Sequence, residues 1–188
     1  MKKIRPKKCK VCRIKFQPER PFQPCCCVKC AIAYVNAQKK KLQRKEDAKT
    51  RERLKTRGMW LREAQGAFNK YTRLRDKDLP CISCGNYHQG QYHAGHFYTT
   101  AARPDLRFNE DNCHKQCSVC NNHKSGNIHE YRPNLIEKIG KDRVDALEVV
   151  GRSDWSIEEI KEIKKEYQEK YKYFKESEKF YKSMIVPF

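Results

Sequence analysis

The sequence is poor in apolar residues and has no long apolar run. Of its 188 residues, 38% are hydrophobic and 35% are charged. A core of that size usually needs metals or partners to hold it together. No stretch of roughly 18 apolar residues could span a membrane, and no apolar run follows the basic start at residues 1–6 as it would in a secretory signal. We therefore expect one or two small domains in a cytoplasmic protein that has no membrane attachment.

Helix breakers are absent from residues 31–57. The chain contains no repeats or Gly/Ser linkers, and from Ala31 onward there is no glycine until Gly58 and no proline until Pro80. Residues 31–57 are rich in Ala, Lys, Arg, Gln and Glu, which are good helix formers. Their apolar positions are too sparse for a buried face. This composition predicts a basic helical arm that is exposed to solvent or partly disordered.

Acidic residues are scarce in the same region. Residues 1–57 hold 20 Lys/Arg against 4 Asp/Glu, a net charge of +16, out of +19 for the whole chain. So strong and localised a charge attracts polyanions, of which nucleic acid is the commonest in a cytosol. A solvated tail or a membrane-surface segment is the alternative. We expect DNA contacts from Lys39, Lys40, Lys41, Arg44 and Lys45.

Cysteine, by contrast, is abundant, with 11 residues. Two Cys-x-x-Cys pairs bracket a 32-residue insert, and their spacing is typical of a tetrahedral four-thiolate zinc site, because each tight turn offers two thiolates. A reducing cytosol favours zinc over disulfides. The predicted zinc ligands here are Cys81, Cys84, Cys117 and Cys120.

A second cysteine set lies in residues 8–30. Cys9 and Cys12 form one pair, and the other pair ends at Cys30, with either Cys26 or Cys27 as the third ligand. The arrangement resembles treble-clef zinc fingers, in which the last cysteine opens a helix, and this resemblance favours Cys26. Merely tolerated thiols are the alternative. We therefore predict a zinc finger over residues 1–30 and about two structural zinc ions per chain.

Two helices with buried stripes are predicted from apolar residues at spacings of three and four. The first occupies residues 59–75. A capping box at Ser156 starts the second, which runs for about five turns and whose stripe serves packing or dimerisation. The stripes are Trp60, Ala64, Ala67, Phe68, Tyr71 and Leu74, and then Ile157, Ile160, Ile163, Tyr167, Tyr171 and Phe174.

The segment between these helices is expected to hold shorter elements. Residues 92–97 are the best candidate for a strand, and a helix is predicted from Cys117 through His123 to near Gly126. A capping pattern at Asn134 and a stop at Gly140 predict a further helix. We expect Cys113 to be a buried thiol and His114 to be exposed.

The insert between the cysteine pairs carries residues suited to phosphodiester hydrolysis. That reaction needs an activated water and a cation for the charge that develops on the phosphate. His96 is the leading base, because a neutral imidazole can accept the proton of water, although a structural histidine is the alternative. Asn112 and Asn121 could orient the ring and bind the ion, and Arg107 and Lys124 could bind flanking phosphates.

These motifs together resemble zinc-stapled HNH endonucleases and, over nearly the whole chain, the NinG (Rap) family of lambdoid phages. The resemblance rests on residues 60–76, 81–85, 93–97, 107–112 and 116–127 and on the N-terminal finger. It implies an α+β fold, mainly helical, with a treble-clef-like finger and a zinc-stapled ββα-metal (His-Me finger) module. Residues 1–30 would form the finger, 31–57 the arm and 58–188 the nuclease domain, including its zinc module at 79–129 and helices at 134–176.

Membership of that family would imply a recombination endonuclease in the host cytoplasm that cuts branched DNA, such as Holliday junctions and D-loops, with magnesium or manganese. His96 matches the general base, Asn112 the residue that orients it, and Asn121 a metal ligand. One departure is Gly95, which stands where many HNH sites have a metal ligand. His93 could replace that ligand if a bulge at residues 94–95 turned it toward the site of His96.

A protein of another class would satisfy part of this pattern. A zinc-containing DNA-binding or architectural protein without catalysis needs only the basic arm and the two zinc modules, and Gly95 favours it. An RNA-directed finger protein has no signature in its support. Resolution of a four-way junction takes two cuts, so a homodimer would suit the nuclease, although no residue proves it.

Overall fold

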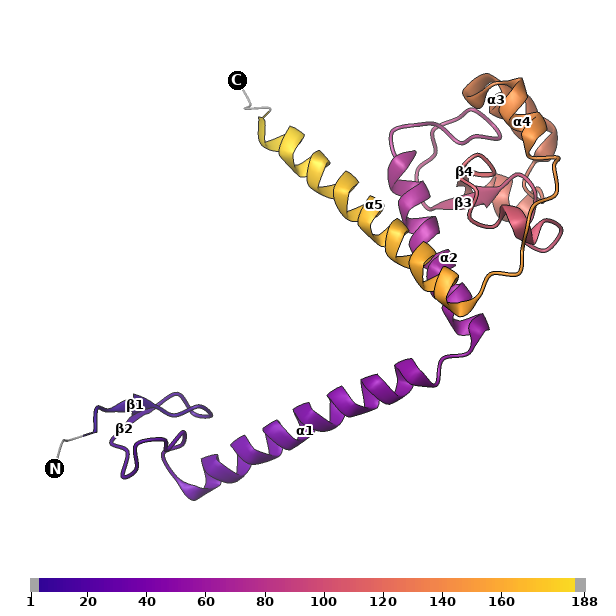
Figure 1. Ribbon diagram of the computed structural model, residues 1–188. Coiled ribbons are helices and arrows are strands. Elements are labelled where there is room, and N and C mark those ends of the chain that lie inside the picture. The colour runs from indigo at the N-terminus through magenta and orange to yellow at the C-terminus, as the bar shows by residue number, and fades with distance from the viewer. Residues whose placement is uncertain (1–3, 185–188) are drawn as a thin grey trace. The chain divides into compact units, whose positions relative to one another are not determined.

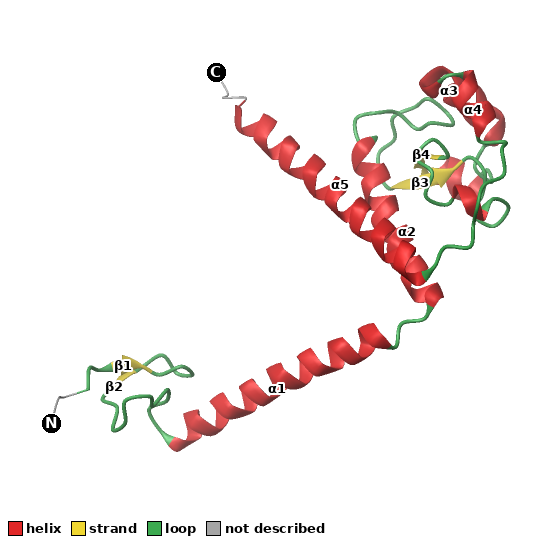
Figure 2. Cartoon of the chain, in the orientation of Figure 1, coloured by secondary structure: helices red, strands yellow, loops and turns green. Residues whose placement is uncertain are grey.

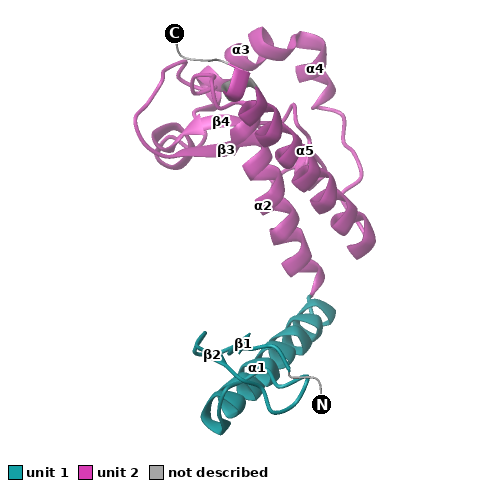
Figure 3. Cartoon of the chain, turned by 90° about the vertical axis from the view of Figure 1, so that its left-hand side faces the viewer, with its two compact units in different colours: residues 1–55 teal, residues 56–188 magenta. Residues whose placement is uncertain are grey.

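A computed structural model describes residues 4–184 of the chain (Figures 1 and 2). The chain divides into two compact units, residues 1–55 and 56–188 (Figure 3). The division after Lys55 places the cysteine-rich segment and the basic helix in one unit, whereas the sequence suggested a boundary at residue 30. Among the described residues, no helix is long and apolar enough to cross a membrane.

Unit 1, residues 1–55, contains a small hairpin and one long helix. Strands β1 (Lys7–Lys8) and β2 (Lys15–Phe16) pair antiparallel, with Lys7 opposite Phe16. Helix α1 (Val28–Arg53) begins three residues before the expected start at Ala31, and none of its residues is buried. This helix therefore owes its stability to the good helix formers in its sequence, not to a packed face.

Unit 2, residues 56–188, is built on two long helices that lie side by side (Figure 1). Helix α2 (Arg57–Arg75) is capped by Thr56, and its buried residues include the predicted Trp60, Ala64, Ala67, Phe68 and Tyr71. Helix α5 (Ile157–Met184) spans 28 residues, more than the five turns expected. The capping box at its start is present, because Ser156 and Glu159 exchange backbone-to-side-chain hydrogen bonds of 2.7 and 3.1 Å.

A two-stranded hairpin packs against α2. Strand β3 (Tyr92–His96) pairs antiparallel with β4 (Cys113–Cys117), one residue to one, from Tyr92–Cys117 to His96–Cys113. The loop between the strands contains a short 3-10 turn at Pro104–Leu106, and a π-helical turn at Val119–His123 follows β4. Helices α3 (Ile128–Ile139) and α4 (Lys141–Ala146) complete the fold.

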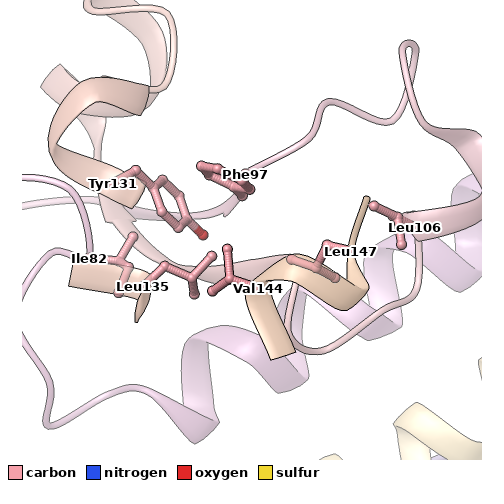
Figure 4. Packing of buried hydrophobic residues seen from close by; sticks show 7 residues of the cluster. All are labelled: Ile82, Phe97, Leu106, Tyr131, Leu135, Val144 and Leu147. Carbon is pink, nitrogen blue, oxygen red and sulfur yellow. The ribbon is translucent and has the colours of Figure 1, made fainter. Parts of the chain in front are cut away.

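An apolar cluster joins α3 and α4 to the hairpin and to the first cysteine turn of this unit (Figure 4). Tyr131, Leu135 and Val144 are fully buried in it. The Tyr131 hydroxyl donates a 3.0 Å hydrogen bond to the Gly95 carbonyl, which ties α3 to β3. The cluster consists of Ile82, Phe97, Leu106, Tyr131, Leu135, Val144 and Leu147.

The helix expected to start at Asn134 starts at Ile128 instead. Asn127 precedes it with a φ of 47°, and Pro133 lies inside the helix. The Asn134 side chain does not cap a helix; it donates 2.9 Å hydrogen bonds to the carbonyls of Ile82 and Ser83. The side chain of Asn134, which the sequence pattern suggested as a helix cap, therefore makes a tertiary contact instead. Gly140 ends the helix as predicted, with a φ of 87°.

Candidate metal centres and histidine site

In unit 2 the two cysteine pairs come together. The Sγ atoms of Cys81, Cys84, Cys117 and Cys120 all lie within 4.8 Å of one another. The first pair sits in a tight turn, closed by a 2.9 Å hydrogen bond from Gly85 N to the Cys81 carbonyl, with Gly85 at a φ of 68°. The second pair spans the end of β4 and the turn after it. The predicted ligand set is therefore assembled, and it could hold one zinc ion.

The ionisation of the thiols in this cluster would be stabilised by a bound cation. Burial opposes ionisation of Cys81, yet the backbone N–H groups of Cys117 and Cys84 lower its pKa. Burial and the neighbouring Cys117 raise the pKa of Cys120 to about 12. One thiolate is therefore favoured, but four so close together would repel one another. A divalent ion removes that conflict, which is the ordinary chemistry of a four-thiolate zinc site.

Hydrogen-bond donors surround the same sulfur atoms. The amides of Cys117 and Cys120 lie 3.3 and 3.4 Å from the Sγ atoms of Cys81 and Cys117. His88 Nε2 lies 3.1 Å from Cys84 Sγ, and Asn127 Nδ2 lies 3.7 Å from Cys120 Sγ. Such donors stabilise metal-bound thiolates and orient them. The sequence had given no role to His88.

Unit 1 holds the second cluster, formed by Cys9, Cys12, Cys26 and Cys30, with all four Sγ atoms within 4.8 Å of one another. Cys26, the residue that the sequence favoured, belongs to this cluster, whereas Cys27 stands at the N-cap position of α1. Burial opposes ionisation of Cys9, but the backbone N–H groups around it lower its pKa to about 5. This cluster could hold a second zinc ion.

His96 ends β3 with one ring nitrogen committed to the backbone. Its Nε2 atom lies 3.1 Å from the carbonyl oxygen of Arg107. Because a carbonyl only accepts, Nε2 carries the proton and donates it, which leaves a lone pair on Nδ1. The buried thiol of Cys113 lies 3.7 Å from this Nδ1 atom. Burial lowers the pKa of His96, and the charge of Arg107 acts in the same direction. The ring is therefore neutral near pH 7 and able to accept a proton at Nδ1.

Asn112 holds the loop that supplies this carbonyl. It is fully buried. Its Oδ1 accepts from the Tyr98 amide at 2.8 Å, and its Nδ2 donates to the carbonyls of Tyr98 and Leu106 at 3.0 and 3.2 Å. These bonds all go to the loop between the strands. Asn112 thus holds the loop that contains Arg107. Because the carbonyl of Arg107 accepts a hydrogen bond from His96, Asn112 acts on the His96 ring indirectly, through this loop.

Gly95 and His93 occupy the other face of β3. A Cβ atom at Gly95 would lie 2.0 Å from Oε1 of Gln116, so that side chain fills the space where a ligand would stand. The one-to-one pairing of residues 92–96 with 113–117 contains no bulge, which leaves His93 and His96 on opposite faces. Among the described residues, His93 Nε2 is buried without a hydrogen-bond partner. Its role as a metal ligand stays a prediction.

The remaining candidates surround this hairpin. Arg107 sends its guanidinium to Gln65 Oε1 at 3.3 Å and to the Thr100 carbonyl at 3.4 Å, while its buried Nε has no partner in the described part of the chain. Asn121 directly follows Cys120 in the π-helical turn and is partly exposed, and Lys124 is exposed. Their contacts with phosphate or metal stay predictions.

His114 belongs to a network of buried charged residues that the sequence did not predict. The expectation that His114 is exposed is wrong. His114 is 2% exposed, as is Asp76. Arg75 Nη2 and Lys138 Nζ lie 2.8 and 3.2 Å from the Asp76 carboxylate. These cations hold the pKa of Asp76 well below its usual range, although burial opposes them. All five residues of β4 are buried, so alternation along the strand gave no signal for this burial. Cys113 is buried as predicted.

Comparison with known proteins places these features in a family. A family model described as "Bacteriophage Lambda NinG protein" matches residues 1–178. Protein ninG of Escherichia phage lambda is 57% identical over 120 residues, which are 63% of this chain and 59% of that protein. Protein ninG of Escherichia phage 933W is 42% identical over 185 residues, 88% of this chain and 92% of that protein. The same protein of Salmonella phage P22 is 54% identical over 125 residues, 66% and 62% of the two chains. No solved structure gives a significant match.

Proposed function

The chain belongs to the NinG family of bacteriophage proteins, and we propose that it is a structure-selective DNA endonuclease acting on branched recombination intermediates, such as Holliday junctions and D-loops. One observation carries the proposal. His96 is neutral and its Nε2 proton is held by the Arg107 carbonyl, so Nδ1 carries the lone pair, whose neighbour is the weak thiol donor of Cys113 at 3.7 Å. A histidine committed to one tautomer in this way is prepared to act as a general base.

In the proposed reaction, Nδ1 of His96 takes a proton from water while the water oxygen bonds to phosphorus. The bond between phosphorus and the leaving oxygen of the sugar then breaks, and that oxygen is protonated from solvent. Asn112 keeps the loop of Arg107 in place, so the imidazole cannot rotate away from the water. The Arg107 guanidinium and Lys124 would contact the phosphates beside the cut.

Asn121 would hold a magnesium or manganese ion, which when bound would supply positive charge to the scissile phosphate and the leaving oxygen. His93 lies on the opposite face of β3 from His96 and does not enter this proposal. The amide oxygen of Asn121 is a ligand that such ions accept. The zinc-binding cysteines serve a different purpose. They tie the end of β4 to the turn that carries Asn121, and so fix this residue relative to the hairpin.

The alternative is a zinc-containing DNA-binding or architectural protein of recombination that does not cut. The basic charge of residues 1–57 supports both functions equally. Gly95 no longer favours this alternative, because Gln116 occupies the space of the missing side chain. A glycine at this position is thus required by packing, and it says nothing against catalysis.

Cleavage of synthetic DNA separates the two functions. We expect a four-way junction to be cut with magnesium or manganese, more readily than a linear duplex, and not in EDTA. His96→Ala should bind the junction normally and cut it about 100-fold more slowly or worse. His129→Ala, which changes an exposed histidine of α3, is the matched control and should cut normally. Full activity of His96→Ala, or no cleavage by the unaltered protein, would leave the DNA-binding alternative.

A further inference from the structure

Helix α1 has one face that differs in chemistry from the rest of its surface. Six exposed residues at helical spacings line a single shallow groove along it. Four of them are cations and two are alanines. The cations flank the alanine row on both sides, because residues three and four after an alanine fall to either side of its own line on the helix. This basic face consists of Ala37, Lys40, Lys41, Arg44, Lys45 and Ala48.

Charges of the opposite sign are kept off this face. In the same stretch, Glu46 falls on the opposite side of the helix. Asp47 lies at the edge of the face beside Lys40, where its carboxylate accepts a 2.8 Å hydrogen bond from Gln43. Arg53 points away from the face, since helical spacing places it in line with the exposed apolar residue Leu42. A helix that is merely solvated usually alternates charges along its face. Here the cations are segregated.

The segregation costs the free helix stability. Lys40 and Arg44 are four residues apart, as are Lys41 and Lys45, and like charges at that spacing repel each other. The helix has no buried residue to compensate. A polyanion laid along the face would attract all four cations, and these attractions would outweigh both repulsions. Burial therefore gives no reason for the arrangement, whereas a charged partner does.

We propose that the basic face of α1 binds a duplex arm of the DNA, with the helix lying in the major groove. This inference rests on the proposed DNA-binding function. The major groove admits an α-helix between two rows of phosphates, and cations on both sides of an alanine row fit that geometry. The alanines let the backbone approach the base edges, and their methyl groups can touch thymine methyls. From Ala37 to Ala48 the face is about 17 Å long, about five base pairs.

The test compares Arg44→Gln with Arg53→Gln in the full zinc-loaded chain. Both substitutions remove one arginine from an exposed position of the same helix, so a nonspecific effect of net charge would be equal for both. Binding to a synthetic four-way junction is measured by fluorescence anisotropy over a range of salt concentrations. Arg44→Gln should lower the slope of log affinity against log salt by about 0.9, and Arg53→Gln should leave it unchanged. Replacing all four cations with glutamine should lower the slope by about 3 to 4.

A second pair of variants tests whether the backbone of α1 lies close to the base edges along the alanine row. Ala48→Leu adds bulk on the basic face, and Thr50→Leu adds it on another side; leucine favours helix at both positions. Circular dichroism shows that the helix is kept. Ala48→Leu should weaken binding about tenfold, and Thr50→Leu should not. Equal effects of the two glutamine variants, or of the two leucine variants, would overturn the basic face while DNA binding itself stands. No binding by the unaltered chain would remove the proposed function together with it.

Discussion

The two cysteine clusters present the same four ligand atoms but lie in different surroundings. In unit 1 the buried residues among those described are Cys9, Pro18 and Cys25, so the cluster is almost all that is packed there. In unit 2 the cluster adjoins a contiguous apolar core and a buried charge network. A four-cysteine metal site can thus take the place of an apolar core in unit 1. In unit 2 the same kind of site cross-links elements that also pack around an apolar core.

The largest effect expected from this difference is on loss of zinc. Elemental analysis should find about two zinc ions per chain. Cys12→Ser should unfold the finger, because a structural zinc there supplies nearly all the folding free energy, of the order of 10 kcal/mol in small zinc domains.

Cys117→Ser should unfold the hairpin module, while the packed pair of α2 and α5 keeps its helicity. Circular dichroism and amide NMR spectra distinguish the two outcomes. A folded finger without zinc would break the comparison.

A matched pair of leucines sharpens the same contrast. Leu135 in α3 is 0% exposed, and Leu42 in α1 is 60% exposed. Leu135→Ala should cost about 2–5 kcal/mol, because it removes buried apolar contacts and leaves a cavity. Leu42→Ala deletes the same atoms and should cost less than about 0.5 kcal/mol. Urea denaturation of both variants measures the difference. A large loss for Leu42→Ala would show that α1 is covered in solution.

The contact between Gly95 and Gln116 predicts a smaller effect in unit 2. Gly95→Ala forces Gln116 out of a space where its Oε1 would lie 2.0 Å from the new methyl group, at a cost of about 1–3 kcal/mol. In the double variant with Gln116→Ala that cost should largely vanish, since the clash is gone. A double-mutant cycle in urea measures the coupling. Additive losses would mean that Gly95 is required for another reason.

Sequence patterns revealed those features that depend on local spacing. The α2 stripe, the Ser156 capping box and the Cys-x-x-Cys pairs follow from spacings of a few residues, so they were predictable. The choice of Cys26 over Cys27 came from the resemblance to treble-clef fingers. Contacts made over long separations were not predictable. In the sequence, Asn134 has the pattern of a helix cap. Its side chain instead binds the carbonyls of Ile82 and Ser83, which only the tertiary fold brings close to it. The need for Gly95 appeared only with the strand register, which puts Gln116 over it.

The burial of His114 belongs to the same class, because its partners come from several elements. Its Nε2 lies 3.1 Å from the carbonyl of Asp111 and therefore donates. Its Nδ1 lies 2.9 Å from both Arg75 Nη2 and Lys138 Nζ, and therefore accepts. A second proton on this ring would point at two cations. No spacing rule could have brought Arg75 and Lys138 to this histidine.

That arrangement predicts how stability depends on pH, the smallest of the expected effects. Burial and the charges of Lys138 and Arg75 lower the pKa of His114, although Asp76 opposes them. Protonation therefore favours the unfolded chain, whose histidine titrates near 6.5. The contribution of His114 is complete above that pH and is lost as the pH falls toward the lower pKa of the folded state. The full loss is set by how far the pKa of folded His114 lies below 6.5, at about 1.4 kcal/mol for each unit.

Urea unfolding at several pH values checks this, with zinc content measured at each one. His96 is also buried with a lowered pKa and contributes in the same direction, so a variant is needed to isolate His114. His114→Gln keeps a neutral group with a donor and an acceptor but cannot titrate. It should be less stable than the unaltered protein above pH 6.5 and lose less stability below it. Parallel curves for the two proteins would mean that His114 has the same pKa in the folded and unfolded states, and that the neighbouring cations do not disfavour its protonation.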